Sequence, residues 1–392
     1  MLLPTPVHSR TFAACRSFRF KDWGGYLAVA AYDPSSEVEY YAVRHGCGLF
    51  DVSPLRKYDI SGPDAGAFLS YLTVRDVAKL AVGRVSYLCW CNDDGQLIDD
   101  GTVTRIDAEH YRLTATLPGL HWVDDRASGF NVTVSDVTDR LVALALQGPQ
   151  ARGLLEQLGE LNKLRFFRSR AVRLAGLDCY LTRTGYTGDL GYEIWADAAD
   201  GPALWDALLA AGAAFGLRPA GLEALDICRI EAGFVLNGID YRSALQCHTA
   251  AQSSTPYECG LGWAVDLERE PFVGQAALRK RRGEERLFGV VADWPAIEAL
   301  FRLQGLPPTI PSAASREGVP LYDGDGCQIG RVTSRTWSPQ LKQYIGIAAA
   351  PQAHAVPGTR LQMEFTVEYQ RRQVPVTVTE LPFFDPPRKR SR

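Results

Sequence analysis

Two periods of apolar residues alternate between about residues 37 and 275. Segments 203–216 and 219–233 repeat apolar residues every three to four positions, which predicts helices, the second of them opened by Pro219. Segments 85–106 and 177–196 alternate apolar and polar residues around turn residues, which predicts two hairpins. We therefore expect mixed helices and strands in this part of the chain.

The pattern changes after the charged run 279–286, which is the likeliest domain boundary. Short apolar runs punctuated by Gly and Pro follow it, and they predict a separate small β unit, either a barrel or a sandwich. The expected division is 1–278, 287–385 and a basic tail, 386–392, that frays.

Composition narrows the class of protein. Of the 392 residues, 46% are hydrophobic and 22% are charged, as in a globular protein too long for one core. The formal net charge of −3 argues against nucleic acid or an anionic membrane as a partner, because both require a basic face. Since no apolar run could span a membrane and the N-terminus does not resemble a signal peptide, we expect a cytoplasmic protein.

The nine cysteines are scattered and form no CxxC pair, and the six histidines show no HxxxH or HExxH spacing. This distribution predicts reduced, buried thiols rather than disulfides. No metal site is expected.

Two acidic positions break the strand patterns. Asp99 and Asp100 are neighbours in a predicted strand, so one of the two should face inward, where an unsatisfied carboxylate is costly. Glu193 lies among apolar strand residues and could accept two parallel hydrogen bonds from an amidine-like edge. The alternatives are a solvated hairpin end for the two aspartates and an ion pair with Arg183 for Glu193.

One cation interrupts an apolar helix face. Leu222, Leu225, Arg229 and Ala232 share one face of the predicted helix, so the Arg229 guanidinium lies in an apolar stripe. It could pair locally with Asp226, three residues earlier, or reach a buried carboxylate or an anionic ligand. Residues and spacing alone thus indicate a multi-domain α/β enzyme with a carboxylate-lined pocket.

An ordered set of segments resembles the glycine cleavage T-protein (aminomethyltransferase) family and its folate-dependent demethylase relatives. The segments are AVRHGCGLFDVS, GRVSYLCWCNDDGQLIDDGTV, LALQGPQA, RTGYTGDLGYEIW, GLRPAGLEALDICRIEAG, TPYECGLGWAVDL with PFVGQAAL, and GRVTSRTWSPQLKQYIGIA. The resemblance implies an α+β, three-domain cloverleaf: two interleaved α/β domains within 1–278, the first ferredoxin-like, and a C-terminal β-barrel.

The resemblance also implies tetrahydrofolate in the central opening and a role for each unusual residue. Asp100 matches the family's catalytic aspartate, and Glu193 matches the acid that binds the pterin edge. Tyr87, Tyr186 and Arg229 match pocket residues.

Three departures from the T-protein pattern concern the donor. Pro54-Leu55-Arg56 replaces His-Met-Gly, segment 237–260 is several residues longer than its counterpart, and Arg335 and Trp337 stand in the closing TSRTWSP element. Arg335, Trp337 and Tyr257 are the candidate donor-binding residues, and a domain-packing role is the alternative for the first two.

These departures favour a demethylase-type enzyme that moves a methyl group, or a methylene derived from an aminomethyl group, from a small N-, O- or S-methylated donor to N5 of tetrahydrofolate. One alternative is a true aminomethyltransferase with a lipoyl carrier protein as partner. Another is a non-catalytic folate-binding protein, although the KGCYxGQ-like motif of such relatives is absent from segment 237–252.

Overall fold

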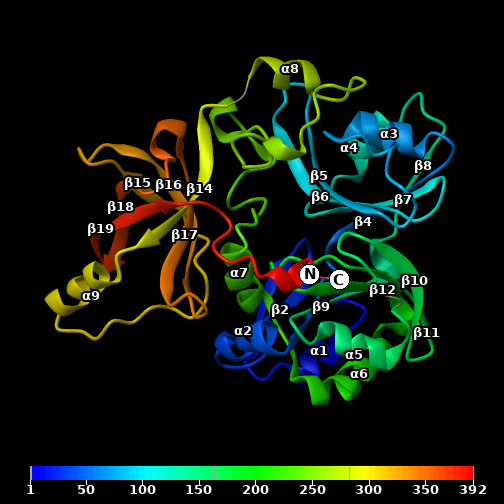
Figure 1. The fold of residues 1–392 in the computed structure, drawn as a ribbon, viewed down its shortest axis with the longest axis horizontal. Helices are drawn as coiled ribbons and strands as arrows, with labels where there is room; N and C mark the ends of the chain where they lie inside the picture. The colour runs from blue at the N-terminus through cyan, green and yellow to red at the C-terminus, as the bar shows by residue number, and fades with distance from the viewer. Residues whose placement is uncertain (1, 162–163, 282, 392) are drawn as a thin grey trace.

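The structure, a computed structural model, describes residues 2–161, 164–281 and 283–391. Figure 1 shows three lobes: a barrel on one side and two α/β lobes on the other, with helix α7 between them. The expected fold class is confirmed, including the closed six-stranded C-terminal barrel.

The first α/β lobe is a five-stranded antiparallel sheet with the order β5-β6-β7-β4-β8. Strands β6, β7, β4 and β8, with helices α3 and α4, follow the ferredoxin-like arrangement, and β5 extends the sheet at one edge. The elements are β4 (Arg56–Ser61), α3 (Ala65–Leu72), β5 (Val85–Cys91), β6 (Leu97–Arg105), β7 (His110–Ala115), α4 (Leu120–Arg126) and β8 (Thr133–Asp136). The predicted turn joins β5 to β6, where Gly95 adopts a φ of 72°.

The second lobe is a six-stranded sheet with the order β10-β11-β12-β9-β3-β13. Strand β3 precedes the first lobe in the chain and the other five strands follow it, so the two lobes interleave. The strands are β3 (Cys47–Asp51), β9 (Leu141–Gln147), β10 (Ser169–Leu174), β11 (Leu177–Thr182), β12 (Gly191–Asp197) and β13 (Leu217–Pro219).

Helices and a short ribbon cover this second sheet. They are α1 (His8–Ala14), the ribbon β1 (Arg19–Trp23) and β2 (Tyr26–Ala31), α2 (Ser36–His45), α5 (Ala151–Leu158), α6 (Gly201–Gly212) and α7 (Leu222–Glu231). The prediction that Pro219 opens a helix is wrong. Pro219 ends β13 beside Leu49, and the helix begins at Leu222. An edge strand such as β13 tolerates proline because it pairs with a neighbouring strand on one side only. On its other side no backbone N–H is needed for a hydrogen bond within the sheet.

The barrel closes in the order β14-β17-β16-β15-β18-β19. Its elements are β14 (Glu285–Ala292), α9 (Trp294–Leu303), β15 (Val319–Tyr322), β16 (Gln328–Ser338), β17 (Gln343–Pro351), β18 (Arg360–Val367) and β19 (Gln370–Thr379). Helix α8 (Gln275–Lys280) precedes it. The barrel has its own apolar core, and a further apolar cluster that includes Cys89, Ile230 and Ile347 joins the lobes.

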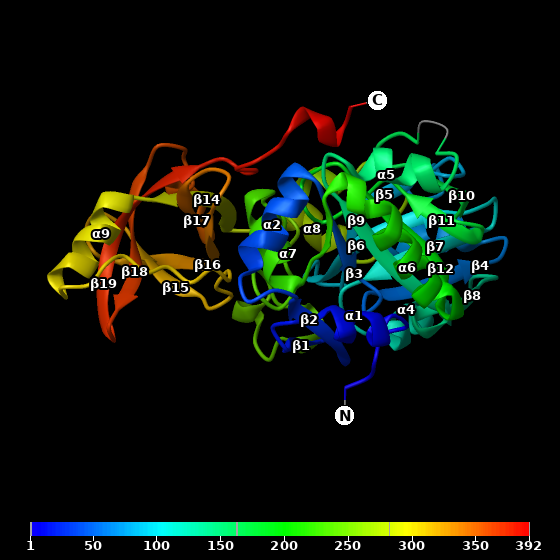
Figure 2. The ribbon, with the colours of Figure 1, turned by 90° about the horizontal axis from the view of Figure 1, so that it is seen from below.

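The basic tail does not fray in its described part, 386–391. Arg388 donates two hydrogen bonds of 2.7 Å to Asp189, and Arg183 donates to the backbone carbonyl of Ser391 at 2.6 Å. Figure 2 shows the C-terminal segment running from the barrel back towards the α/β part of the molecule, where Arg388 contacts Asp189 of the second lobe. The expectation of a frayed tail is therefore wrong, because buried carboxylate and arginine partners hold it.

Candidate active site

A cavity of about 980 Å³ lies where the lobes meet. Both α/β lobes, the segment after α7, the barrel and the C-terminal tail contribute to its lining. Of the residues singled out from the sequence, Tyr87, Asp100, Tyr186 and Glu193 line this cavity. The structure thus brings together residues that lie up to about a hundred positions apart in the chain.

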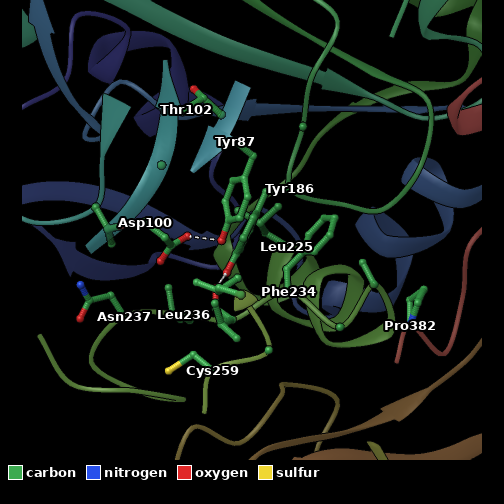
Figure 3. Close-up of a pocket in the computed structure, with 18 of the residues that line it drawn as sticks. Tyr87, Asp100, Thr102, Tyr186, Leu225, Phe234, Leu236, Asn237, Cys259 and Pro382 are labelled. Carbon is green, nitrogen blue, oxygen red and sulfur yellow. Dashed lines mark hydrogen bonds between the residues drawn. The ribbon is translucent and has the colours of Figure 1, made fainter. Parts of the chain in front are cut away.

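The two neighbouring aspartates on β6 are both buried. Asp100 lines the cavity and accepts hydrogen bonds from the hydroxyl of Tyr87, at 2.7 Å, and from that of Tyr241. Figure 3 shows the Tyr87 hydroxyl pointing to the Asp100 carboxylate. Asp99 accepts instead from the Asn237 amide at 2.8 Å and from two backbone N–H groups after β7. A solvated hairpin end, the alternative for this pair, does not occur.

Burial sets the electrostatics of this pair. It raises the pKa of Asp99 to about 7, and the negative charge of Asp100 adds to the effect. Burial also raises the pKa of Asp100, while its two tyrosine donors lower it. Two adjacent carboxylates in a low-dielectric site therefore hold protons more tightly than free aspartates do. The pair can therefore take up a proton at a higher pH than free aspartates do.

Two aromatic pairs form walls of the cavity. Tyr87 stacks on Trp263 with ring centroids 6.0 Å apart, and Tyr186 stacks on Phe234 at 5.5 Å. The hydroxyl of Tyr186 donates to the backbone carbonyl of Val235, which fixes the ring. All four rings line the cavity, so a flat, partly apolar ligand would meet aromatic surface there.

Glu193 extends from the middle of β12, between β9 and β11, and faces the cavity. Burial raises the pKa of its carboxyl group to about 7, while the hydroxyl of Thr184 and the charge of Lys57 lower it. Arg183, the alternative partner considered from the sequence, donates instead to the backbone carbonyls of Leu164 and Ser391. The Glu193 carboxylate is therefore available to a ligand in the cavity.

Arg229 lies beneath the cavity rather than in its lining. Its side chain has no exposed surface, and it pairs with Asp240 at 2.6 Å and with Asp226 at 3.2 Å. It also donates to the Ser334 hydroxyl of the barrel at 2.7 Å. The local pair with Asp226 that the sequence offered as an alternative is thus present, within a larger network. Asp226 itself lines the cavity and pairs with Arg316.

The three candidate donor-binding residues are not in the described lining of the cavity. Trp337 packs on Trp294 within the barrel, with ring centroids 4.8 Å apart. Arg335 donates to the Glu317 carbonyl of a neighbouring loop, and Tyr257 packs in the cluster that joins the lobes. The structure therefore places them in packing contacts.

Sequence reasoning missed several residues that complete the site. Asn237 and Tyr241 hold the two aspartates, and both belong to segment 237–260, whose extra length was the one available signal. Arg316 reaches the cavity from a barrel loop that carries no periodic pattern. In the described part of the chain no group of three His, Cys, Asp or Glu side chains could hold a metal ion. The helices described there include none long and apolar enough to cross a membrane.

Comparison with known proteins decides the family. Residues 12–269 match the model of the GCVT N-terminal domain, and residues 302–385 match that of the glycine cleavage T-protein C-terminal barrel domain. The chain belongs to the glycine cleavage T-protein family. It is therefore an enzyme of folate-dependent one-carbon transfer, as the sequence motifs predicted.

Individual members of the family are similar over nearly the whole chain. An aminomethyltransferase of Streptomyces avermitilis is 34% identical to this chain. The alignment covers 97% of this chain and 98% of that enzyme. A trimethylamine-oxide aldolase of Ruegeria pomeroyi is 33% identical over 95% of this chain, which spans 46% of that longer protein. The crystal structure of aminomethyltransferase T from Bartonella henselae superimposes with a TM-score of 0.83 at 28% identity, over 98% of this chain and 99% of that one.

Proposed function

We propose that this enzyme moves a one-carbon unit from a small methylated donor to N5 of tetrahydrofolate, with Asp100 as the catalytic residue. The observation that carries the proposal is the Asp100 carboxylate inside the cavity, held by two tyrosine hydroxyls and flanked by aromatic walls. This arrangement favours positive charge on the reacting group. Proximity within one cavity can contribute on the order of 7 kcal/mol to lowering the barrier.

The residues of the cavity fit a reduced folate as the acceptor substrate. A reduced pterin carries a donor-rich edge, and Glu193 supplies a carboxylate acceptor that faces the cavity. Tyr186 and Phe234 supply a stacked aromatic wall. The reactive nitrogen belongs to the folate, so the protein contributes binding, orientation and charge.

Asp100 has two roles in this proposal. Its carboxylate stabilises positive charge at the carbon being transferred. As the bond from that carbon to N5 forms, the bond from the carbon to the donor heteroatom breaks, and the demethylated donor leaves with the electron pair of that bond. Asp100 accepts the proton that N5 loses. The raised pKa of Asp100, due to burial, makes the group a better proton acceptor than a free aspartate. Tyr87 and Tyr241 fix the two carboxylate oxygens in place.

Two features support a small donor over an aminomethyl-lipoyl carrier protein. Leu55, within the Pro54-Leu55-Arg56 departure, lines the cavity, and the long segment 237–260 supplies Tyr241 to Asp100. In addition, one relative is named for trimethylamine oxide, a small methylated nitrogen compound. The aminomethyltransferase reaction is the competing candidate, because relatives of equal similarity bear that name.

A donor panel tests the proposal. The enzyme is incubated without oxygen with tetrahydrofolate and, separately, with a methylated amine, a sulfonium compound, a methoxy-aromatic compound or an aminomethyl-lipoyl carrier protein. Chromatography then measures 5-methyl- and 5,10-methylenetetrahydrofolate. We expect turnover with at least one small donor and none with the carrier. Turnover with the carrier alone would show the aminomethyltransferase reaction, and folate binding without any turnover would show a binding protein.

A further inference from the structure

One lysine of the first lobe is buried without a carboxylate partner. Lys57 of β4 is 1% exposed, and its ammonium group donates to the backbone carbonyls of Ser53, at 2.8 Å, and Leu55, at 2.6 Å. In the part of the chain that the structure describes, the lysines that pair with a carboxylate are Lys79 and Lys389. Lysine is almost never fully buried unless it is paired, so the retained charge of Lys57 indicates a role other than packing.

The strand register places Lys57 on the cavity side of the first sheet. Lys57 is paired with Thr114 of β7, and Thr114 is paired with Thr102 of β6. Residues opposite one another on neighbouring strands project to the same face of a sheet. Thr102 and Thr114 both line the cavity. The Lys57 side chain therefore leaves the sheet towards the cavity and ends just behind its described lining.

The two carbonyls that Lys57 binds belong to the turn between β3 and β4. Leu55 of this turn lines the cavity, and its N–H donates to the Val52 carbonyl at 3.1 Å. Arg56, the next residue, donates to the carbonyl of Gly24, which also lines the cavity. This turn is where the sequence departs from the T-protein pattern. Lys57 thus fixes a part of the cavity wall that distinguishes this chain.

The ammonium group also acts across the cavity, on Glu193 of the second lobe. Burial raises the pKa of the Glu193 carboxyl group to about 7, and the charge of Lys57 lowers it. Burial in turn lowers the pKa of Lys57 itself to about 7. The other charged groups that act on Lys57 are Asp51 of β3, Arg56 of β4, Arg112 of β7 and Asp136 of β8. Lys57 is therefore the link between the charge of Glu193 and the first lobe.

We propose that Lys57 is a positioning residue of the folate site, which fixes the turn 53–55 and supplies the positive charge that keeps the Glu193 carboxylate ionised. This inference rests on the proposed function, in which Glu193 accepts hydrogen bonds from the pterin edge. An ionised carboxylate offers two acceptor oxygens to such an edge, whereas a protonated one sets a donor against it. Burial alone favours the protonated form, so a nearby cation favours folate binding around neutral pH.

The test measures how tetrahydrofolate affinity depends on pH. Dissociation constants are determined calorimetrically, without oxygen, from about pH 5.5 to about pH 8.5. The variants at the site are the neutral Lys57→Gln and Lys57→Met and the charge-keeping Lys57→Arg, each also combined with Glu193→Gln. Thermal unfolding of every variant confirms that it folds. Lys79→Gln is the matched control, because Lys79 is an exposed lysine that pairs with Asp76 outside the site.

We expect the wild-type affinity to rise with pH through about 7, where Glu193 ionises. In Lys57→Gln and Lys57→Met this rise should move to higher pH by about half a unit to one unit, because a carboxylate that loses a nearby cation holds its proton more tightly. Lys57→Arg and Lys79→Gln should keep the wild-type midpoint. With Glu193→Gln the rise should disappear, whatever residue stands at position 57.

One outcome separates a charge role from a purely structural one. If the neutral variants lost affinity equally at every pH and kept the wild-type midpoint, Lys57 would only hold the turn, and the inference would be overturned with the proposed function intact. A rise that persisted in Glu193→Gln would also overturn the inference, because another group would then be titrating. Failure of the wild type to bind tetrahydrofolate at any pH would instead overturn the proposed function.

Discussion

At the scale of single residues, two carboxylates in the cavity are held at a cost to stability. Glu193 and Asp100 both have pKa values raised by burial, and neither pairs with a cation in the part of the chain that the structure describes. Thr184 supports Glu193, and two tyrosine hydroxyls support Asp100. Buried charge that weakens the fold is common where function requires it.

Glu193→Gln should stabilise the folded protein in a pH-dependent way. The carboxyl group has a pKa of about 7 in the folded protein against a usual value of 4.5, so the folded state binds this proton more tightly. The stability that the raised pKa provides is complete below about pH 4.5 and is lost as the pH rises through about 7. The glutamine variant does not titrate, so it should gain about 1–2 kcal/mol relative to the wild type between pH 5 and pH 8.

Urea denaturation at the two pH values measures this gain, and titration with tetrahydrofolate should show at least about a tenfold loss of affinity in the same variant. A stability difference that does not depend on pH would contradict the assignment of a partly buried, titrating carboxyl group to Glu193.

At the scale of elements, α7 organises the centre of the molecule. All ten of its residues are buried, and the charged ones find partners elsewhere in the chain. Glu231 binds Arg44 of α2 and the Ser338 hydroxyl of the barrel, and Arg229 binds Asp240 and Ser334. Buried ion pairs of this kind fix how elements pack, because any misplacement leaves a charge unpaired.

Arg229→Met should lower the free energy of unfolding by about 3–5 kcal/mol, since it leaves Asp240 buried without its cation. Guanidinium denaturation measures the loss. The exposed Arg279→Gln, which removes only a surface pair with Glu268, is the matched control and should cost little. If Arg229→Met kept its stability and lost only folate affinity, Arg229 would be a ligand-binding residue, as the family motif suggests.

The same helix shows what the sequence could and could not predict. Its existence follows from the helical spacing of apolar residues, and the oddity of Arg229 was visible in that pattern. Its barrel partner Ser334 lies 105 residues away in the chain, and a residue pattern carries no information on such a distance. For the same reason Asp100 and Glu193 could be singled out as unusual carboxylates, whereas Arg316 lacked a local signal and Tyr241 had only the extra length of its segment.

At the scale of the whole molecule, the lobes depend on one another around the cavity. The C-terminal tail leaves the barrel, crosses to the second lobe and binds Asp189, whose side chain has no exposed surface. Asp189 also contacts Arg44 at 3.3 Å. The tail therefore links the barrel to the second α/β lobe through the ion network around Asp189.

Arg388→Gln should destabilise the protein by about 1–3 kcal/mol, because it removes both charged hydrogen bonds to Asp189. Thermal unfolding measures the change. Arg390→Gln serves as the control, since its partner Asp385 also binds Lys389. Equal unfolding temperatures for Arg388→Gln and the wild type would show that the tail is not held as described.

The most direct test of the whole account is Asp100→Asn, with tetrahydrofolate affinity and donor turnover measured separately. Asparagine keeps the size of the side chain but can neither carry the charge nor take the proton. Its carbonyl oxygen can accept from one of the two tyrosine hydroxyls, and its amide N–H donates to the oxygen of the other. We expect folate affinity within about threefold of the wild type and turnover reduced on the order of a hundredfold or more. Wild-type turnover in this variant, on the donor that the wild type uses, would contradict the account.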